Sequence, residues 1–220
     1  MQVGDPRFDR AAQVARETWP EGKAIEEWQQ NNFILVAGSS WPPEEKLLAE
    51  AMATYPKWKL LLAPHDLSQS HLNSLKEQFA LYGIDSWGTF SGNPENRVLL
   101  IDKIGLLKSL YRCGDAAIVG GGLGKSLHST IEPMAYGLPL AFGPAHRKFL
   151  EPQELIDRGG ATEIHDAQDF LQWLQPLLAN SRTLKQGQSI VRDYFQEKCG
   201  ATNLIVQKMI ELWRKSEQNR

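Results

Sequence analysis

The segment with the strongest chemical signature is a glycine-rich loop at residues 119–126, which reads Val-Gly-Gly-Gly-Leu-Gly-Lys-Ser. Four glycines within five positions cost conformational entropy, so they favour a turn at which the backbone comes close to a ligand. The loop is not a Walker A phosphate loop, because Val119 stands where that motif needs a glycine, five residues before Gly124. It is not a dinucleotide fingerprint either, because Lys125 or Leu127 occupies the place of the third glycine. The loop therefore predicts a binding turn of another kind.

Glu132 stands at the expected start of a helix, because Pro133 is tolerated only in a first helical turn. A carboxylate at that place can accept two hydrogen bonds from the vicinal hydroxyls of a ribose, and the helix dipole favours its ionised form. Ser129 and Glu132 also have the spacing of a capping box, in which each side chain bonds a backbone amide of the first turn. The residues alone leave the ribose contact and the capping box equally open.

Four further turns follow apolar runs and carry small, polar or cationic residues. Residues 38–41 (Gly-Ser-Ser-Trp) could cradle a phosphate or form a plain turn with a serine cap. His65 could donate to a phosphate or a sugar hydroxyl, or lie in solvent. Residues 104–105 (Ile-Gly) could bring backbone amides to a ligand or simply open a helix capped by Asp102. The basic residues 146–148 could attract an anion or form a solvated turn.

The elements that must position these turns alternate along the chain. Five continuous apolar runs predict buried strands at 33–37, 58–63, 98–100, 116–119 and 138–142. Because the runs do not alternate with polar residues, both faces of the sheet should be covered. Segments between and after them have helical apolar spacing, at 43–55, 68–82, 104–111, 129–136 and 149–156. This order predicts an α/β domain with a Rossmann-like parallel sheet flanked by helices, whose ligand crevice lies at the carboxyl ends of the strands.

The two ends of the chain depart from this alternation. The C-terminal part is purely helical in its spacing and is expected to pack on the flank of the sheet, at 167–178, 184–198 and 201–214. Residues 5–30 mix charges and prolines with one weak helix at 10–18, which is typical of a connecting segment. We therefore expect a linker over residues 1–30, one ligand-binding domain over 31–215 and a polar tail over 216–220.

Composition argues against several classes of function. A net charge of −2 and an isoelectric point near 6.2 do not suit a protein that tracks nucleic-acid backbones, so no nucleic-acid partner is expected. The two cysteines, Cys113 and Cys199, lie far apart and show no metal-ligand spacing with the five histidines, which favours a reduced, cytoplasmic setting without a metal. No apolar run reaches the roughly 18 to 20 residues of a membrane helix, and the polar N-terminus is unlike a signal peptide. No transmembrane segment is expected.

The order and spacing of six segments resemble the C-terminal half of 3-deoxy-D-manno-octulosonic acid (Kdo) transferases, most of all the Bacteroidetes-type sequences. The resemblance runs from Gly4 to about Trp213, and residues 3–10 look like the connector that leads out of the family's N-terminal domain. The six segments are 37–41 (Ala-Gly-Ser-Ser-Trp), 64–65 (Pro-His), 101–107 (Ile-Asp-Lys-Ile-Gly-Leu-Leu), 120–122 (Gly-Gly-Gly), 128–133 (His-Ser-Thr-Ile-Glu-Pro) and 142–144 (Phe-Gly-Pro). Each is weak alone, but their order is specific. The resemblance implies the C-terminal domain of a GT-B glycosyltransferase.

By the same resemblance, residues 31–215 would hold the nucleotide-sugar donor, CMP-Kdo or CMP. The contacts implied for the donor phosphate or the Kdo carboxylate come from Ser39, Ser40 and His65. Those implied for the cytosine and ribose region come from Ile104 and Gly105, those for the sugar from Gly121 and Gly122, and that for the ribose hydroxyls from Glu132. The remaining members of the predicted donor-binding set are Trp41, Pro64, Leu123, His128 and Ser129. No cofactor and no metal are implied.

The family transfers Kdo with inversion onto a lipid A precursor at the cytoplasmic face of the inner membrane, in lipopolysaccharide synthesis. The resemblance places the general base in an N-terminal acceptor domain, which we expect to be absent from this chain. It therefore implies no catalytic residue here, and a domain that binds its donor without transferring it.

Two departures from the family pattern leave other functions open. Ser129 stands where asparagine is usual, and the family's Asp-Thr-Met-Gly-Glu segment is replaced around Lys103, Ile104 and Leu106, so nucleotide contacts there would come from the backbone. One alternative is a donor domain, or an epimerase of similar shape, that uses a UDP-sugar. The other is a non-catalytic regulatory domain with a degenerate pocket. Competition between nucleotides separates the first alternative from CMP binding.

Overall fold

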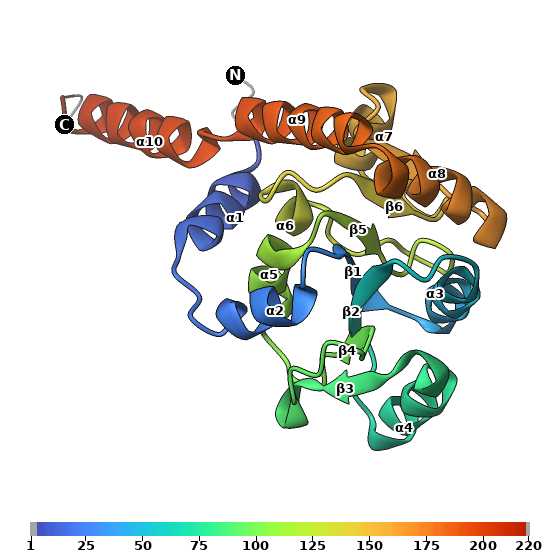
Figure 1. Ribbon diagram of the computed structural model, residues 1–220. Coiled ribbons are helices and arrows are strands. Elements are labelled where there is room, and N and C mark those ends of the chain that lie inside the picture. The colour runs from blue at the N-terminus through green and yellow to red at the C-terminus, as the bar shows by residue number, and fades with distance from the viewer. Residues whose placement is uncertain (1–3, 219–220) are drawn as a thin grey trace.

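The fold is a seven-stranded parallel sheet with helices on both faces, in a computed structural model that describes residues 4–218 (Figure 1). The strand order is β3-β4-β2-β1-β5-β6-β7, and every neighbouring pair is parallel. This confirms the predicted α/β class. The strands are β1 (Phe33–Ser40), β2 (Trp58–Pro64), β3 (Ile84–Ser86), β4 (Val98–Leu100), β5 (Ala116–Val119), β6 (Leu140–Phe142) and β7 (Ala161–Glu163).

Most helices lie where helical segments were expected, with different bounds, but α2 lies in a segment where no helix was predicted. They are α1 (Pro6–Arg16), α2 (Gly22–Gln29), α3 (Pro42–Thr54), α4 (Gln69–Gln78), α5 (Leu107–Leu110), α6 (Ile131–Met134), α7 (Leu150–Asp157), α8 (Ala167–Ala179), α9 (Ser181–Lys198) and α10 (Ala201–Gln218). Three short 3₁₀ helices lie between these elements: η1 (Ala80–Tyr82), η2 (Trp87–Thr89) and η3 (Tyr111–Cys113). The segment expected to be helical at 104–111 becomes helical only at Leu107, so Asp102 does not cap it; its carboxylate accepts from the Gly88 amide instead, at 3.2 Å.

The five predicted strands are present because their apolar runs are buried on both faces of the sheet. In β1, Ile34 and Val36 belong to one hydrophobic cluster, while Leu35 and Ala37 belong to the cluster on the opposite face. Two strands, β3 and β7, were not predicted. Each is a three-residue strand at an edge of the sheet and is only partly buried, so neither carries a continuous apolar run.

The N-terminal helices pack on the same core as the sheet. Phe8 in α1 and both Ile25 and Trp28 in α2 are at most 1% exposed and join one hydrophobic cluster with β1 and β5. The helix expected at residues 10–18 begins earlier, because Asp5 caps α1 with its side chain and a proline opens the first turn. Residues 6–29 are thus part of the folded unit, while a connecting role toward another domain stays a prediction. Residues 1–3 lie outside the described part of the chain.

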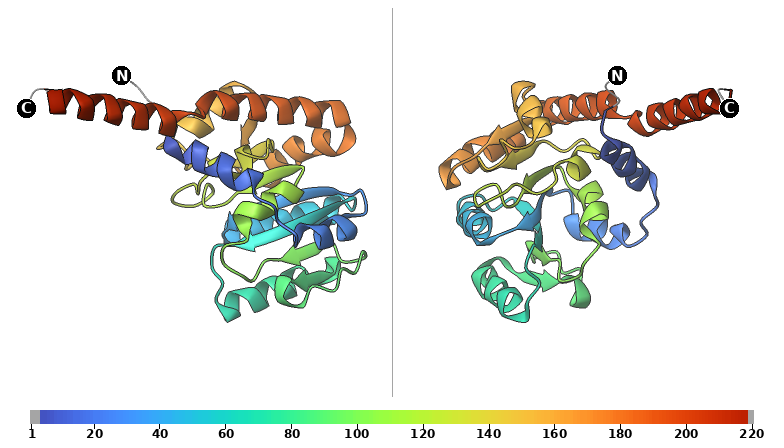
Figure 2. Two further views of the ribbon diagram at one scale, coloured as in Figure 1. Left: turned by 90° about the vertical axis from the view of Figure 1, so that its left-hand side faces the viewer. Right: turned by 180° about the vertical axis from the view of Figure 1, so that it is seen from behind.

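Helix α10 extends away from the sheet at the end of the chain (Figure 2). Its start is fixed to α1, because the Asp9 carboxylate accepts from the amides of Gly200 at 2.5 Å and Thr202 at 2.7 Å. The expected polar tail at 216–220 begins within this helix, and residues 219–220 lie outside the described part. Across residues 4–218, every helix is too short or too polar to cross a membrane.

The order of the strands reverses direction at β1, which pairs with β2 on one side and with β5 on the other. In open parallel sheets, the loops that leave the carboxyl ends of such neighbouring strands diverge and leave a crevice between them. Here the connection after β1 is the single residue Trp41, and the loop after β5 spans residues 120–130. They contain the aromatic and the glycine-rich segments singled out in the sequence. The fold therefore brings the two most informative motifs to one place.

Candidate functional site

The ends of β1 and β5 approach each other closely enough to require glycine. The Gly120 amide donates to the Gly38 carbonyl at 2.9 Å, and a β-carbon on Gly120 would overlap the Ser39 carbonyl oxygen. Ser39 itself has a left-handed backbone, with φ of 53°. Because a side chain cannot fit between these backbones, residue 120 has to be glycine for the two loops to meet.

The other glycines of the loop have different reasons. A β-carbon on Gly122 would lie 2.5 Å from the Gly143 nitrogen, and Gly121 has φ of +82°, a conformation that glycine adopts without strain. A β-carbon on Gly124 would meet only the Gly121 carbonyl oxygen, at 3.6 Å. The glycine content of this loop thus reflects backbone packing and turn geometry as well as access for a ligand, which the sequence could not distinguish.

The buried side chain of Glu44 links the β1 and β5 loops by hydrogen bonds. It is 1% exposed, and its two carboxylate oxygens accept hydrogen bonds from the Trp41 amide at 3.1 Å and the Leu123 amide at 3.0 Å. The expected serine cap of the following helix is therefore not formed, because Trp41 is the N-cap residue of α3. Sequence reasoning missed Glu44; its signal was a glutamate three residues after an N-cap position.

Ser40 points into the protein rather than toward a ligand. It is 1% exposed, and its hydroxyl donates to the Glu45 carboxylate at 3.1 Å. The same Glu45 oxygen also contacts His71 Nε2 at 3.1 Å, and burial raises the pKa of this carboxyl. Of the two predicted serines, only Ser39 lines a cavity.

Three aromatic side chains from three loops form a stack over the crevice. Ring centroids lie 4.5 Å apart for Trp41 and His65, and 4.6 Å apart for His65 and His128. Trp41 Nε1 donates to His128 Nε2 at 3.0 Å. An indole N–H can only donate, so His128 Nε2 carries no proton and the imidazole is neutral with its proton on Nδ1. Burial and the neighbouring His65 lower the pKa of His128, in the same direction.

A cavity of about 290 Å³ lies beside this stack, at the carboxyl ends of β1 and β5. It collects five of the predicted site residues, namely Ser39, Gly105, His128, Ser129 and Glu132. Its other lining residues are Gly38, Leu107, Lys108, Tyr111 and Val119. The lining comes from three chain segments: the end of β1, residues 105–111 and residues 119–132. They meet because β1 and β5 are paired, and because the α5 segment follows β4 at the carboxyl ends of the strands.

Tyr111 is a lining residue that sequence reasoning missed. The side chain is 3% exposed, and its hydroxyl lies against the Cα of Gly38, where any β-carbon would overlap it. Burial raises the pKa of Tyr111, so the hydroxyl stays protonated and able to donate. The sequence offered only an aromatic at the end of a short helix, which is typical of a core residue.

The geometry at Glu132 separates the two readings left open by the sequence. The N-cap residue of α6 is Thr130, and it makes no side-chain cap bond. The Ser129 hydroxyl donates directly to Glu132 Oε2. The capping box, one of the two alternatives left open by the sequence, is therefore not formed. Within residues 4–218, no hydrogen bond or ion pair engages the second carboxylate oxygen, and Glu132 lines the cavity with acceptor capacity to spare.

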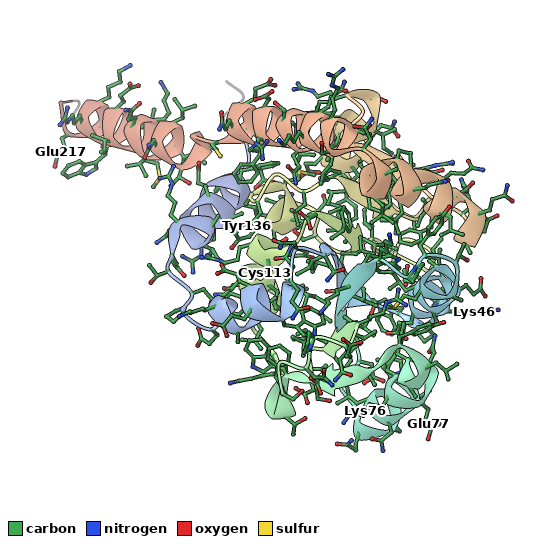
Figure 3. The ribbon with its side chains drawn as sticks, viewed as in Figure 1. Lys46, Lys76, Glu77, Cys113, Tyr136 and Glu217 are labelled. Carbon is green, nitrogen blue, oxygen red and sulfur yellow. The ribbon has the colours of Figure 1, made fainter. Side chains whose placement is uncertain are left out.

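Helices α5 and α6 hold this cavity wall together. Tyr136, which is labelled in Figure 3, lies two residues after α6, and its hydroxyl donates to the Lys108 carbonyl oxygen in α5 at 2.8 Å. A smaller cavity of about 210 Å³ continues from here under α1, and it shares Lys108, Ser129 and Glu132 with the first. Its lining also includes Arg7 and Arg10 from the N-terminal helix α1.

A second large cavity, of about 460 Å³, lies on the other side of His128. It contains two more predicted residues, Trp41 and Gly121, and its remaining lining comes from Pro42, Pro43, Gly124, Lys125 and Ser126. The other predicted residues line neither large cavity. They are the buried Ser40 and Pro64, the 86% exposed Ile104, and both Gly122 and Leu123 in the glycine loop. His65 also lines neither, but it belongs to the aromatic stack.

The basic turn at 146–148 is not a uniform cationic patch. His146 is 1% exposed, and its Nε2 lies 2.5 Å from the Glu163 carboxylate, so only Arg147 and Lys148 face solvent. Glu163 ends the edge strand β7, which sequence reasoning missed. The expected anion attraction by three side chains is therefore reduced to two.

The fold is that of the C-terminal domains of GT-B glycosyltransferases. The crystal structure of the C-terminal CMP-Kdo binding domain of WaaA from Acinetobacter baumannii superposes with a TM-score of 0.67, at 20% identity, over 86% of this chain and 97% of that one. Anabaena HepE in complex with UDP superposes with a TM-score of 0.62, at 17% identity, over 93% of this chain and 55% of that one.

In sequence, the chain is similar to 3-deoxy-D-manno-octulosonic acid transferases. The enzyme of Aquifex aeolicus is 30% identical over 171 residues, which are 75% of this chain and 46% of the relative. That of Chlamydia trachomatis is 30% identical over 117 residues, which are 50% of this chain and 27% of the relative. The chain thus spans about half or less of the length of these relatives. No family model matches. The expected likeness to Bacteroidetes sequences stays a prediction.

Proposed function

We propose that this chain is the CMP-Kdo binding domain of a Kdo transferase. The observation that carries the proposal is the Glu132 carboxylate, oriented by Ser129 and left with a free acceptor oxygen in a cavity at the strand-order reversal. That position is where nucleotides bind in open parallel sheets, and a carboxylate there grips vicinal hydroxyls. The similarity to Kdo transferases and the fold shared with a CMP-Kdo binding domain support the choice of nucleotide.

In this proposal each wall of the 290 Å³ cavity contacts a different part of CMP. Glu132 accepts from the two ribose hydroxyls. The turn around Gly105, which has φ of +90° and open space beside its Cα, presents backbone amides to the ribose and cytosine. The phosphate faces Ser39 and the protonated hydroxyl of Tyr111, which can donate a hydrogen bond without a charge of its own.

The reaction would be completed outside these residues. The proposed chemistry is an inverting displacement at the anomeric carbon of Kdo, with a lipid A precursor as acceptor at the cytoplasmic face of the inner membrane. The general base that activates the acceptor hydroxyl would come from an acceptor-binding domain. Here the chain supplies donor binding and orientation, which are separate contributions to the rate.

Calorimetry with a panel of nucleotides tests the proposed ligand. We expect CMP to bind with a dissociation constant of roughly 0.1 to 1 mM, because in this proposal residues 31–215 supply one wall of an interdomain cleft. The panel includes UDP and NAD, and UDP has a specific rival claim because Anabaena HepE shares this fold and is titled as a complex with it. Clearly tighter binding of UDP or NAD than of CMP would overturn the proposal.

A second test asks whether the chain transfers Kdo by itself. The purified protein, CMP-Kdo and a lipid A precursor are incubated together, and product is followed by mass spectrometry. We expect no transfer, with a purified full-length Kdo transferase as the positive control. Measurable product from the 220-residue chain would contradict the division of labour between donor and acceptor domains.

A further inference from the structure

The 460 Å³ cavity lined by Trp41, Gly121 and Lys125 has no part in holding the nucleotide as proposed above. It adjoins the nucleotide cavity, because His128 lines both. A group attached to the phosphate of CMP would leave the first cavity at this end, past the β1 and β5 loops. The second cavity is therefore placed to receive what the nucleotide carries.

One wall of this cavity is an oriented aromatic face. Trp41 is 38% exposed, yet it is held on two sides, by the ring of His65 at 4.5 Å and by the hydrogen bond from its Nε1 to His128. The adjacent Pro42 and Pro43 extend the apolar wall. A rigid indole beside prolines suits the C–H face of a pyranose ring, since the aromatic ring is already fixed before binding.

The charge of the cavity comes from one side chain. His128 is neutral, because its Nε2 accepts the Trp41 N–H. Of the residues that line the cavity, Lys125 is thus the one with a permanent positive charge. Among residues 4–218 no carboxylate forms an ion pair with it, and it stands on the exposed tip of the glycine loop. An uncompensated ammonium in an otherwise neutral cavity favours a ligand with one negative charge.

We propose that this cavity is the subsite for the sugar of the donor, that the pyranose lies on Trp41, and that Lys125 binds the carboxylate of a sugar acid. Lys125 then determines the preference for an acidic over a neutral sugar. The inference rests on the proposed function, because it needs the nucleotide in the adjoining cavity. It assigns a role to a residue of the glycine-rich loop that is outside the predicted donor-binding set and does not line the nucleotide cavity.

The test compares CMP with freshly prepared CMP-Kdo on the parent chain, on Lys125→Met and on a control, Lys46→Met. Lys46 is an exposed lysine on α3 that lines neither cavity (Figure 3). Methionine keeps most of the side-chain length and removes the charge. We expect Lys125→Met to bind CMP-Kdo about tenfold more weakly than the parent does, because a charge-assisted contact is lost. CMP affinity should stay within about twofold, and Lys46→Met should match the parent for both ligands.

A ligand-side control makes the result specific to the carboxylate. The methyl ester of the Kdo carboxyl group removes the negative charge from CMP-Kdo, so the parent should bind the ester about tenfold more weakly and Lys125→Met should bind acid and ester alike. Equal affinity of parent and Lys125→Met for CMP-Kdo, or an equal loss for CMP and CMP-Kdo, overturns the inference. Failure of the parent to bind CMP at all would instead overturn the proposed function on which it rests.

Discussion

The cavities at the carboxyl ends of the strands differ in size and in chemistry from the cavity at their amino ends. We call these two sides of the sheet the carboxyl edge and the amino edge. At the carboxyl edge, cavities of about 290 and 460 Å³ surround the Trp41 and His128 pair. At the amino edge lies a larger one, of about 790 Å³, between the start of β1 and the end of α8. It is lined by Phe33, Tyr55, Asp115 and several amide side chains. By volume alone, the amino edge would be the site.

The chemistry of the polar groups reverses that ranking. The Asp115 carboxylate already accepts from the Ile34 amide at 2.8 Å, and burial raises its pKa. At the carboxyl edge, Glu132 keeps a free acceptor oxygen, Lys125 has no paired carboxylate within residues 4–218, and Tyr111 has a protonated hydroxyl. Each carboxylate has one oxygen engaged, but the Asp115 bond holds the backbone of β1, whereas Glu132 is held only by the Ser129 side chain, so we assign the ligand to the carboxyl edge despite its smaller cavities.

The largest expected effect comes from a side chain that blocks the close approach of the β1 and β5 loops. Gly120→Ala places a β-carbon on the Ser39 carbonyl oxygen and forces the paired strands apart. We expect a loss of roughly 3 kcal/mol or more in the free energy of unfolding, and loss of detectable CMP binding. That corresponds to a fall in melting temperature of roughly 6 to 12 °C, measured by calorimetry.

The matched control for this change is Gly124→Ala in the same loop. Its β-carbon would meet only the Gly121 carbonyl oxygen, at an ordinary 3.6 Å. The variant should melt within about 2 °C of the parent. If both variants are equally stable, the close approach of the two loops does not require glycine at residue 120.

Glu132→Gln separates binding from stability at the carboxyl edge. Glutamine keeps the size of the side chain but removes the charge from its contacts with the ribose hydroxyls. We expect CMP affinity to fall roughly tenfold or more, while the melting temperature without ligand barely moves, since no helix cap depends on the carboxylate. The counterpart at the amino edge is Asp115→Asn, which should leave CMP affinity unchanged. A Glu132→Gln protein that binds CMP like the parent would remove the ribose contact from the account.

The smallest effect concerns the Trp41 and His128 pair and depends on pH. Burial and the accepted N–H favour the neutral imidazole, so the pKa of His128 in the folded protein lies below its unfolded value near 6.5. The contribution of this contact to the free energy of unfolding is fully present above the pKa of His128 in the unfolded chain. It is lost as the pH falls through the lower pKa of His128 in the folded protein. Trp41→Phe should therefore cost about 1 kcal/mol or less at pH 8, and this cost should shrink as the pH falls below 6.5 and through the folded pKa of His128.

Nuclear magnetic resonance reports the same contact directly. Titration of the His128 ring signals should give a higher pKa in Trp41→Phe than in the parent, because the donated hydrogen bond no longer favours the neutral form. Nitrogen shifts of the parent should show the proton on Nδ1. Identical titration curves for the two proteins would mean that the indole does not control this imidazole in solution.

The sequence contained enough to predict the fold but only part of the site. Continuous apolar runs identified every long strand, since burial on both faces leaves a clear pattern. The three-residue edge strands β3 and β7 left none, because pairing on one side alone needs few apolar residues. The segment at 6–29 looked like a linker for a similar reason: its buried Phe8, Ile25 and Trp28 are scattered among charged residues.

At the site, the motifs located the loops but not the direction of each side chain. Ser39 and Ser40 are neighbours, but the register of β1 shifts between Gly38 and Ser40, and with the left-handed backbone at Ser39 one serine lines the cavity while the other contacts Glu45. Tyr111 was missed because it stands in no motif, and Lys125 because it only marked where the glycine-rich loop departs from known phosphate motifs; packing of distant segments brings both to cavities. Such contacts depend on tertiary structure, which spacing along the chain does not contain.

A crystal of this chain soaked with CMP tests the central claim most directly. The account predicts electron density at the carboxyl edge, with the ribose hydroxyls within hydrogen-bond distance of the Glu132 carboxylate and the phosphate beside Ser39. A soak at several millimolar, well above the expected dissociation constant of roughly 0.1 to 1 mM, should fill the site. CMP bound in the 790 Å³ cavity at the amino edge, or a carboxyl edge left empty at that concentration, would contradict the account.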